Sequence, residues 1–169
     1  VRNRSINKNP ALIAQCASDQ DVQKAVNFAR ENALLVAVKC GGHSVSGKGT
    51  CNDGLMIDLS PLRGSRVDVN NKRIFMKGGS WLGELDAAAL PHGLGTTAGT
   101  VSHTGIGGLS LGGGFGRLGR KFGLTLDNIK SVEIVTADGK LQYASEMENS
   151  DLFWAIRGGG GNFGIVTTF

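Results

Sequence analysis

Residues 39–47 carry the prediction of the fold, and they read Lys39-Cys40-Gly41-Gly42-His43-Ser44-Val45-Ser46-Gly47. They follow an apolar run at residues 34–38, which is too short and too rich in β-branched side chains for a helix and predicts a strand. Glycine lets the backbone adopt positive φ and lets another group approach its N–H donors without a Cβ in the way. A strand that runs into such a loop predicts a site that holds a ligand by its backbone, most often a phosphate.

Glycine recurs at two further places. Residues 105–116 read Gly105-Ile106-Gly107-Gly108-Leu109-Ser110-Leu111-Gly112-Gly113-Gly114-Phe115-Gly116, and a third cluster covers residues 158–164. Glycine makes up 27 of the 169 residues, more than twice its average share of about 7%. Because the excess lies between apolar segments, it predicts loops within a folded domain rather than a low-complexity chain.

Composition and charge disfavour several classes of protein. A hydrophobic content of 40% predicts a folded domain rather than a disordered chain. The net charge of +4 is spread along the chain without a long basic run, so it gives no support to nucleic-acid binding. No stretch of 18 apolar residues occurs, so no transmembrane helix and no membrane partner are predicted.

The three cysteines, Cys16, Cys40 and Cys51, show no CxxC spacing. This pattern predicts neither a zinc site nor a dense disulfide framework, and it favours a reducing compartment such as the cytoplasm. For Cys40, pairing with Cys51 and chemical reactivity stay open beside the favoured interpretation, a small buried thiol in a tight loop.

Periodicity and turn residues predict a succession of elements. Ser18 and Asp21 resemble a capping box, and apolar residues at helical spacing predict a helix at residues 19–31. With strands at residues 34–38 and 55–59, this helix would form a small α/β unit over residues 10–60. After it we expect a hairpin of residues 66–69 and 73–76 that turns at Asn70-Asn71, and then a helix through residue 90 that is capped by Ser80. Two further strands are expected at residues 128–136 and 140–144, joined at Asp138-Gly139. A short helix capped by Ser150 and a strand at residues 164–169 are expected to follow them.

Two nucleotide-binding motifs are nearly matched, each in the wrong context. Residues 42–49 resemble a Walker A loop, but Gly49 stands where that loop needs a hydroxyl and a helix start, which disfavours a nucleoside triphosphatase. Residues 114–119 match GxGxxG, but more glycine precedes them instead of a strand. We interpret this second match as an accident of glycine abundance.

His43 is the histidine with the strongest functional signal. A lone histidine is more often structural, but the neighbouring Gly41, Gly42 and Ser44 predict an exposed, tightly turning backbone that is a poor place to bury a ring. A neutral imidazole nitrogen is also a nucleophile that can bond a cofactor. His92, at a predicted helix end, is expected to be a capping or surface residue.

In their order along the chain, these stretches resemble the PCMH-type FAD-binding domain of the vanillyl-alcohol oxidase superfamily, particularly its berberine-bridge-enzyme-like and 6-hydroxy-D-nicotine-oxidase-like branch. The resemblance is carried by residues 39–47, 99–108, 111–116, 123–128 and 151–166. It implies an α+β fold with two lobes: a small α/β lobe over about residues 1–64, then a larger lobe with antiparallel hairpins and helices over about residues 65–169. It also implies that the family's C-terminal substrate domain lies outside this chain.

The resemblance implies FAD as the cofactor, with residues 39–47 around its pyrophosphate and residues 99–108 on its other side. His43 would be joined covalently to the 8α-methyl group, and Val101 stands where some members carry a second, cysteinyl link, which implies a single link. The implied cofactor-binding residues are Lys39, Cys40, Gly41, Gly42, His43, Ser44, Val45, Gly47, Gly99, Thr100, Ser102, His103, Gly105, Ile106, Gly107, Gly108, Gly164, Ile165 and Val166. No residue is assigned as catalytic base, and no metal site is predicted.

The implied activity is that of an FAD-linked oxidoreductase. Hydride would pass from a small-molecule substrate, an alcohol, sugar or cyclic amine, to flavin N5, and molecular oxygen would reoxidise the flavin. Two alternatives stay open: a dehydrogenase with another electron acceptor, and a flavin-binding module without catalysis of its own. Because the glycine loops offer no general base apart from His43 and His103, this chain by itself is expected to be inactive.

Overall fold

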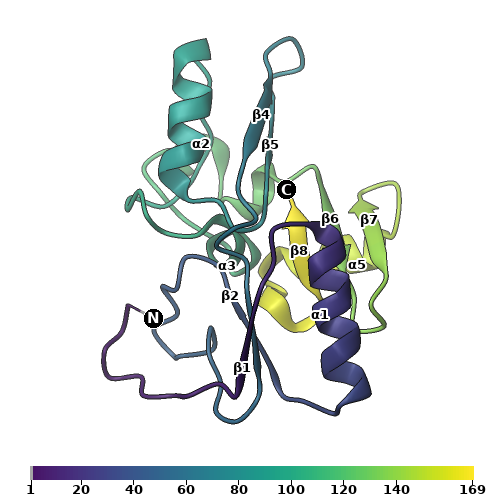
Figure 1. Ribbon diagram of the computed structural model, residues 1–169. Helices are drawn as coiled ribbons and strands as arrows, with labels where there is room; N and C mark the ends of the chain where they lie inside the picture. The colour runs from purple at the N-terminus through teal and green to yellow at the C-terminus, as the bar shows by residue number, and fades with distance from the viewer. Residues whose placement is uncertain (1) are drawn as a thin grey trace.

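A parallel sheet of three strands forms the first part of the structure, a computed structural model that describes residues 2–169 (Figure 1). Its strands are β1 (Leu12–Gln15), β2 (Val36–Lys39) and β3 (Leu55–Asp58), in the order β1-β3-β2. The central strand β3 has all four side chains buried, as its position between two neighbours requires. Helix α1 (Asp19–Glu31) connects β1 to β2, and the predicted capping box at its start is confirmed.

Antiparallel strands form the second part. A hairpin of β4 (Ser65–Asp68) and β5 (Arg73–Met76) precedes a sheet of β6 (Ser131–Val135), β7 (Leu141–Ser145) and β8 (Ile165–Thr168), in the order β7-β6-β8. Met76 and Phe169 exchange both backbone hydrogen bonds, at 2.9 and 2.8 Å. The hairpin therefore continues the sheet beyond β8.

Four helices belong to the second part: α2 (Leu82–Ala89), α3 (Ile106–Leu111), α4 (Gly119–Phe122) and α5 (Ser150–Gly159). Short 3-10 helices lie at Leu90–His92, Leu126–Asn128 and Gly160–Asn162. In Figure 1, α2 and the β4–β5 hairpin project in the same direction, away from the parallel sheet. In the described part of the chain no helix is long and apolar enough to cross a membrane.

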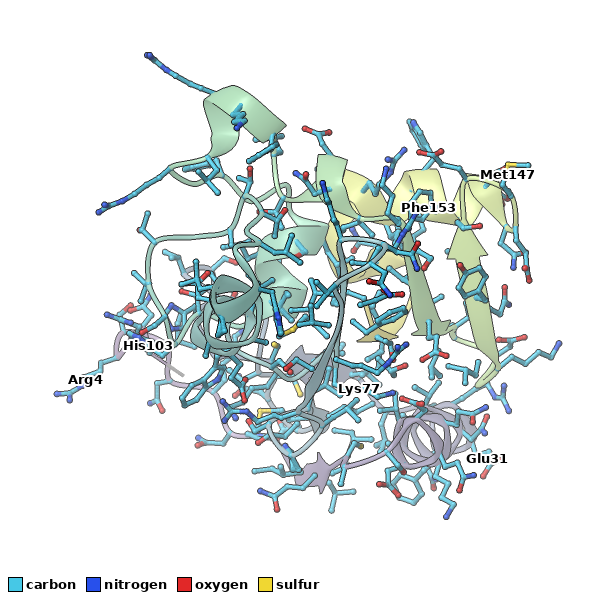
Figure 2. The ribbon with its side chains drawn as sticks, turned by 90° about the horizontal axis from the view of Figure 1, so that it is seen from above. Arg4, Glu31, Lys77, His103, Met147 and Phe153 are labelled. Carbon is cyan, nitrogen blue, oxygen red and sulfur yellow. The ribbon has the colours of Figure 1, made fainter. Side chains whose placement is uncertain are left out.

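Helix α1 joins the two parts through a shared core. Its buried Val22 and Ala29 belong to one cluster with Ile57 of β3, Val135 of β6 and Ile165 of β8. A polar link runs alongside this core. The Lys77 ammonium, near the centre of Figure 2, lies 3.2 Å from both Asp19 carboxylate oxygens and donates to Thr168 Oγ1 at 2.9 Å. The α+β class is confirmed, whereas the lobe boundary near residue 64 stays a prediction.

Strand β1 was not predicted, and β2 begins later than expected. Leu12 and Ile13 are 46% and 56% exposed, so β1 lacks the alternating pattern that reveals a half-buried strand. The expected strand at residues 34–38 starts instead at Val36, because Leu34 donates its N–H to Ala29 and so completes the last turn of α1.

The turn and capping predictions at three places were wrong. In the hairpin turn, the positive φ falls on Lys72 rather than on Asn70 or Asn71. Ser80 does not cap α2: its hydroxyl is buried and bonded to Gly64, and the N-cap is Trp81. Helix α5 has Asn149 as its N-cap, and the predicted cap, Ser150, is its first residue.

Candidate functional site

The three glycine clusters meet along one groove with a volume of about 1100 Å³. This volume lies slightly above the roughly 300–1,000 Å³ typical of small-molecule sites, so the groove can hold a large ligand. Its lining residues come from the N-terminal segment, strand β2 and the residue before it, and the loop after β2. Others come from the residue after β3, from α3 and its start, from the end of α5 with the Gly160–Asn162 turn, and from the start of β8. They are Lys8, Leu35, Val36, Ala37, Val38, Lys39, Cys40, Gly41, Gly42, His43, Ser44, Lys48, Gly49, Thr50, Cys51, Asn52, Leu59, Thr104, Gly105, Gly107, Gly108, Leu109, Leu111, Gly158, Gly159, Gly160, Gly161, Asn162, Gly164, Ile165 and Val166.

The structure brings twelve of the nineteen predicted cofactor residues to this groove. They are Lys39, Cys40, Gly41, Gly42, His43, Ser44, Gly105, Gly107, Gly108, Gly164, Ile165 and Val166. Seven lie outside its lining: Val45, Gly47, Gly99, Thr100, Ser102, His103 and Ile106. Two of these seven have a packing role, since a Cβ on Gly99 would lie 2.6 Å from a Leu109 methyl and Ser102 packs against Gly83.

The loop after β2 carries backbone N–H donors without partners among the described residues. Residue Gly42 has φ +71°, which turns the chain directly after β2. Within residues 2–169, the N–H groups of Gly42, His43 and Ser44 donate no hydrogen bond. Successive unpaired N–H groups on a turning backbone form an anion-binding concavity.

The first two glycine loops touch each other through their backbones. A Cβ on Gly41 would lie 2.2 Å from the Gly105 nitrogen, and one on Gly105 would lie 2.3 Å from the Gly41 nitrogen. No real Cβ approaches a backbone atom so closely, so only glycine fits at either position. This contact closes the groove around His43.

Gly108 on α3 has the opposite surroundings. A Cβ there would meet no protein atom within 4 Å, and the same holds for Gly160 and Gly161 in the third cluster. Glycine within a helix destabilises it by roughly 1 kcal/mol relative to alanine. Since Gly108 also lines the groove, the space in front of it is free for a ligand.

The charge along the groove is positive. Lys8, Lys39 and Lys48 line it, and no aspartate or glutamate is among its described lining residues. Lys39, however, is engaged: its ammonium lies 2.9 Å from Asp58 Oδ2 and donates to Ser60 Oγ at 2.7 Å. Lys39 thus lines the groove with its charge paired at the end of β2, and its predicted contact with the cofactor stays a prediction.

Asp58 is ionised in this pair. Burial raises the pKa of its carboxyl, but hydrogen bonds from Ser60 and Lys39 outweigh the burial and hold the pKa below its usual range. The positive charge left for a ligand comes mainly from Lys8 and Lys48, for which no ion pair with a described residue is found.

The ring of His43 lies partly buried at the groove wall. Thr104 Oγ1 lies 3.5 Å from its Nδ1, and Nε2 is buried without a hydrogen-bond partner among the described residues. The expectation of an exposed ring was therefore only partly right. Burial lowers the pKa of His43, and Arg2 and His103 lower it further, so the imidazole is neutral at pH 7.

Cys40 is held as a thiol. Its Sγ donates to the Gly78 carbonyl oxygen at 3.0 Å, and Cys16, Cys40 and Cys51 are all free, so the pairing of Cys40 with Cys51 is excluded. Burial raises the pKa of the Cys40 thiol, and the N–H groups of Gly107, Gly41 and Gly108 offset only part of that rise. A protonated thiol is a poor nucleophile.

Several groove residues were not predicted. Thr104 lies in the predicted stretch 99–108 but was not named among the individual cofactor-binding residues, and Gly158–Gly161 had been noted as a cluster without being assigned to the site. Gly158 (φ +110°) and Gly160 (φ +70°) kink the end of α5 toward the groove. The density of glycine in residues 158–164 was the sequence signal that could have assigned this third cluster to the groove.

The donor set fits FAD. Unpaired N–H groups suit a diphosphate, the lysines complement its charge, open Cβ positions leave space, and the buried Nε2 of His43 needs a further partner.

A second hollow of about 480 Å³, lined mainly by the β4–β5 hairpin and strands β6 to β8, is not reached by any glycine loop. Among residues 2–169 no group of three or more potential metal ligands is found.

Comparison with known proteins agrees with this geometry. Residues 10–145 match the family described as FAD binding domain. An FAD-linked oxidoreductase of Dictyostelium discoideum is 42% identical over 167 residues, which are 99% of this chain and 36% of that protein. The solved structure of 6-hydroxy-D-nicotine oxidase from Arthrobacter nicotinovorans has a TM-score of 0.95 at 40% identity and covers 98% of this chain, which spans 36% of that protein.

A third similar protein carries a covalent cofactor. Glucooligosaccharide oxidase from Acremonium strictum has a TM-score of 0.91 at 37% identity, over 99% of this chain and 36% of that protein, and contains a 6-S-cysteinyl, 8α-N1-histidyl FAD. The chain thus spans about a third of the length of the relatives that it matches.

Proposed function

Because the chain belongs to the PCMH-type FAD-binding domains of the berberine-bridge-enzyme-like and 6-hydroxy-D-nicotine-oxidase-like FAD-linked oxidoreductases, we propose that it holds the flavin of an oxidase by one covalent link, through His43. The observation that carries the proposal is the convergence of three glycine clusters, unpaired backbone donors and His43 on one groove.

Each part of the groove has a role in this proposal. The N–H groups of Gly42, His43 and Ser44 bind the diphosphate, and Lys8 and Lys48 neutralise part of its charge. Backbone groups of Ile165 and Val166 contact the cofactor from β8. FAD supplies the hydride acceptor and passes the electrons on to oxygen, while the protein binds and orients it.

The link to His43 would be one C–N bond. It would replace a C–H bond of the 8α-methyl group and the N–H bond of the neutral imidazole, and oxygen would take up the two hydrogens with their electrons as hydrogen peroxide. The neutral state of His43, which burial favours, supplies the lone pair that this bond needs.

The substrate in this proposal is a small alcohol, sugar or cyclic amine, since two of the similar proteins are a nicotine oxidase and a glucooligosaccharide oxidase. The described groove has no carboxylate to act as base, so a flavin-binding module without its own catalysis is the second candidate. Oxygen consumption with such substrates, measured for the full-length protein, separates an oxidase from a dehydrogenase or a module.

We predict that Gly108→Ala has opposite effects on the free protein and on the complex. Removing a helical glycine raises the stability of the flavin-free protein by about 0.5–1 kcal/mol. The new methyl group occupies the space in front of α3, and a clash of about 1–3 kcal/mol weakens FAD binding roughly tenfold or more. Urea unfolding and calorimetric titration with FAD measure the two effects.

Gly119→Ala is the matched control for this prediction. Gly119 also lies in a helix with open space at its Cβ position, but it does not line the groove. It is expected to raise stability without changing FAD affinity. Equal affinity for FAD in the Gly108→Ala and Gly119→Ala proteins would contradict the assignment of the groove.

A further inference from the structure

The environment of His43 contains a second imidazole that does not line the groove. The rings of His43 and His103 lie edge to face, with centroids 4.8 Å apart and an interplanar angle of 65°. His103 and the neighbouring Thr104 both contact His43, but only Thr104 lines the groove. His103 therefore contacts His43 without lining the groove.

The N-terminal segment holds His103 in turn. A guanidinium nitrogen of Arg2 is hydrogen-bonded to His103 Nε2, and the Arg2 N–H donates to the Gly42 carbonyl oxygen at 2.9 Å. Asn3 donates to the Val45 carbonyl oxygen at 2.9 Å. Figure 2 shows the labelled Arg4 beside His103 at one edge of the molecule. The segment is thus tied both to the His43 loop and to His103.

The contact with Arg2 anchors the His103 ring, because a guanidinium nitrogen of Arg2 is hydrogen-bonded to His103 Nε2. The edge-to-face contact of His103 restricts rotation of the His43 ring, and the nearby positive charge of Arg2 opposes a second positive charge on His43.

We propose that His103, anchored by Arg2, is a positioning residue that holds the His43 ring in the orientation required for attachment of the flavin. The proposal rests on the proposed function for its chemistry, but the arrangement itself exists without cofactor. Holding a nucleophile in one orientation accelerates attack because the rotational freedom of the ring is already lost. Besides Arg2 and His103, no other titratable or charged group is found to act on His43 among the described residues.

The test compares His103→Ala and His103→Phe with the wild type, and uses His92→Ala as a control for loss of an exposed histidine outside the groove. His103 is exposed, so its replacement leaves the core intact. In flavin-free protein, an NMR titration is expected to show the His43 pKa rising toward its ordinary value of about 6.5 in His103→Ala. After addition of FAD, covalent attachment at pH 7 is expected to slow about tenfold while the dissociation constant stays within about threefold.

His103→Phe separates positioning from a merely structural role. Phenylalanine keeps a flat ring beside His43 without an acceptor for Arg2, so part of the attachment rate is expected to return. An unchanged His43 pKa in His103→Ala, or attachment as fast as in the wild type, would overturn the proposal. If the wild-type protein binds FAD without any covalent link, the proposed link is refuted. The NMR titration would still decide whether His103 changes the environment and the pKa of His43.

Discussion

His43→Ala is expected to leave FAD bound and to abolish its covalent attachment. The diphosphate is proposed to bind backbone N–H groups, which the substitution leaves in place. The affinity for FAD is therefore expected to fall only by the contribution that the contacts of the His43 ring make. The covalent bond, in contrast, has no substitute, because alanine carries no nucleophilic atom. Acid denaturation followed by mass spectrometry of the pellet measures the fraction of protein that retains flavin.

Cys40 is a second nucleophile in the groove. It lines the groove, but its thiol is hydrogen-bonded to Gly78 and burial raises its pKa, so it stays protonated at neutral pH. Val101, where a cysteinyl link is expected in bicovalent relatives, has no nucleophilic atom. A single site of attachment is therefore predicted.

His92→Ala is the control for this prediction, since His92 is an exposed residue of the Leu90–His92 turn and does not line the groove. It is expected to retain the full covalent fraction. Flavin retained in the pellet by His43→Ala would reveal another anchor. Flavin released into the supernatant by the wild type would show that the cofactor is bound without a covalent link.

Gly41→Ala is expected to have the largest effect on the groove as a whole. Its Cβ would lie 2.2 Å from the Gly105 nitrogen, and neither partner is a side chain that can rotate away. The two glycine loops must separate, which costs about 1–3 kcal/mol or more of stability. We expect a fall in the melting temperature of about 3–10 °C and FAD affinity reduced at least tenfold.

The size of this effect is judged against Gly119→Ala, which adds the same methyl group in open space. That variant is expected to melt at or slightly above the wild-type temperature. If Gly41→Ala melted at the wild-type temperature and bound FAD normally, the loop contact would not shape the groove, and the description of the site would have to change.

Local sequence signals predicted the elements that depend on local interactions. The capping box of Ser18 and Asp21 placed α1 correctly, and Asp138-Gly139 placed the turn between β6 and β7. Ser80 failed as a cap because its hydroxyl is bonded to Gly64, sixteen residues away, a tertiary contact that propensity does not register. Strand β1 was missed because its exposed apolar residues show no alternation.

At the site, too, local sequence signals could be predicted and tertiary contacts could not. Glycine density located all three clusters that line the groove, because a backbone that holds a ligand closely needs glycine wherever it lies in the chain. The pairing of Lys39 with Asp58 and the contact of His43 with His103 join residues 19 and 60 positions apart, and only the folded chain brings them together. Gly99 shows a tertiary constraint of the same kind, since a Cβ there would lie 2.6 Å from Leu109 and 2.9 Å from Leu82, and its assignment to the cofactor stays a prediction.

Amide hydrogen exchange with and without FAD tests the central claim most directly. In the free protein the N–H groups of Gly42, His43 and Ser44 have no acceptor within residues 2–169, so they are expected to exchange rapidly. Bound FAD is expected to slow their exchange and that of residues 105–108, while residues 75–77, which line the smaller hollow, stay unchanged. Saturation with FAD that leaves the exchange of Gly42, His43 and Ser44 unaltered would contradict the account.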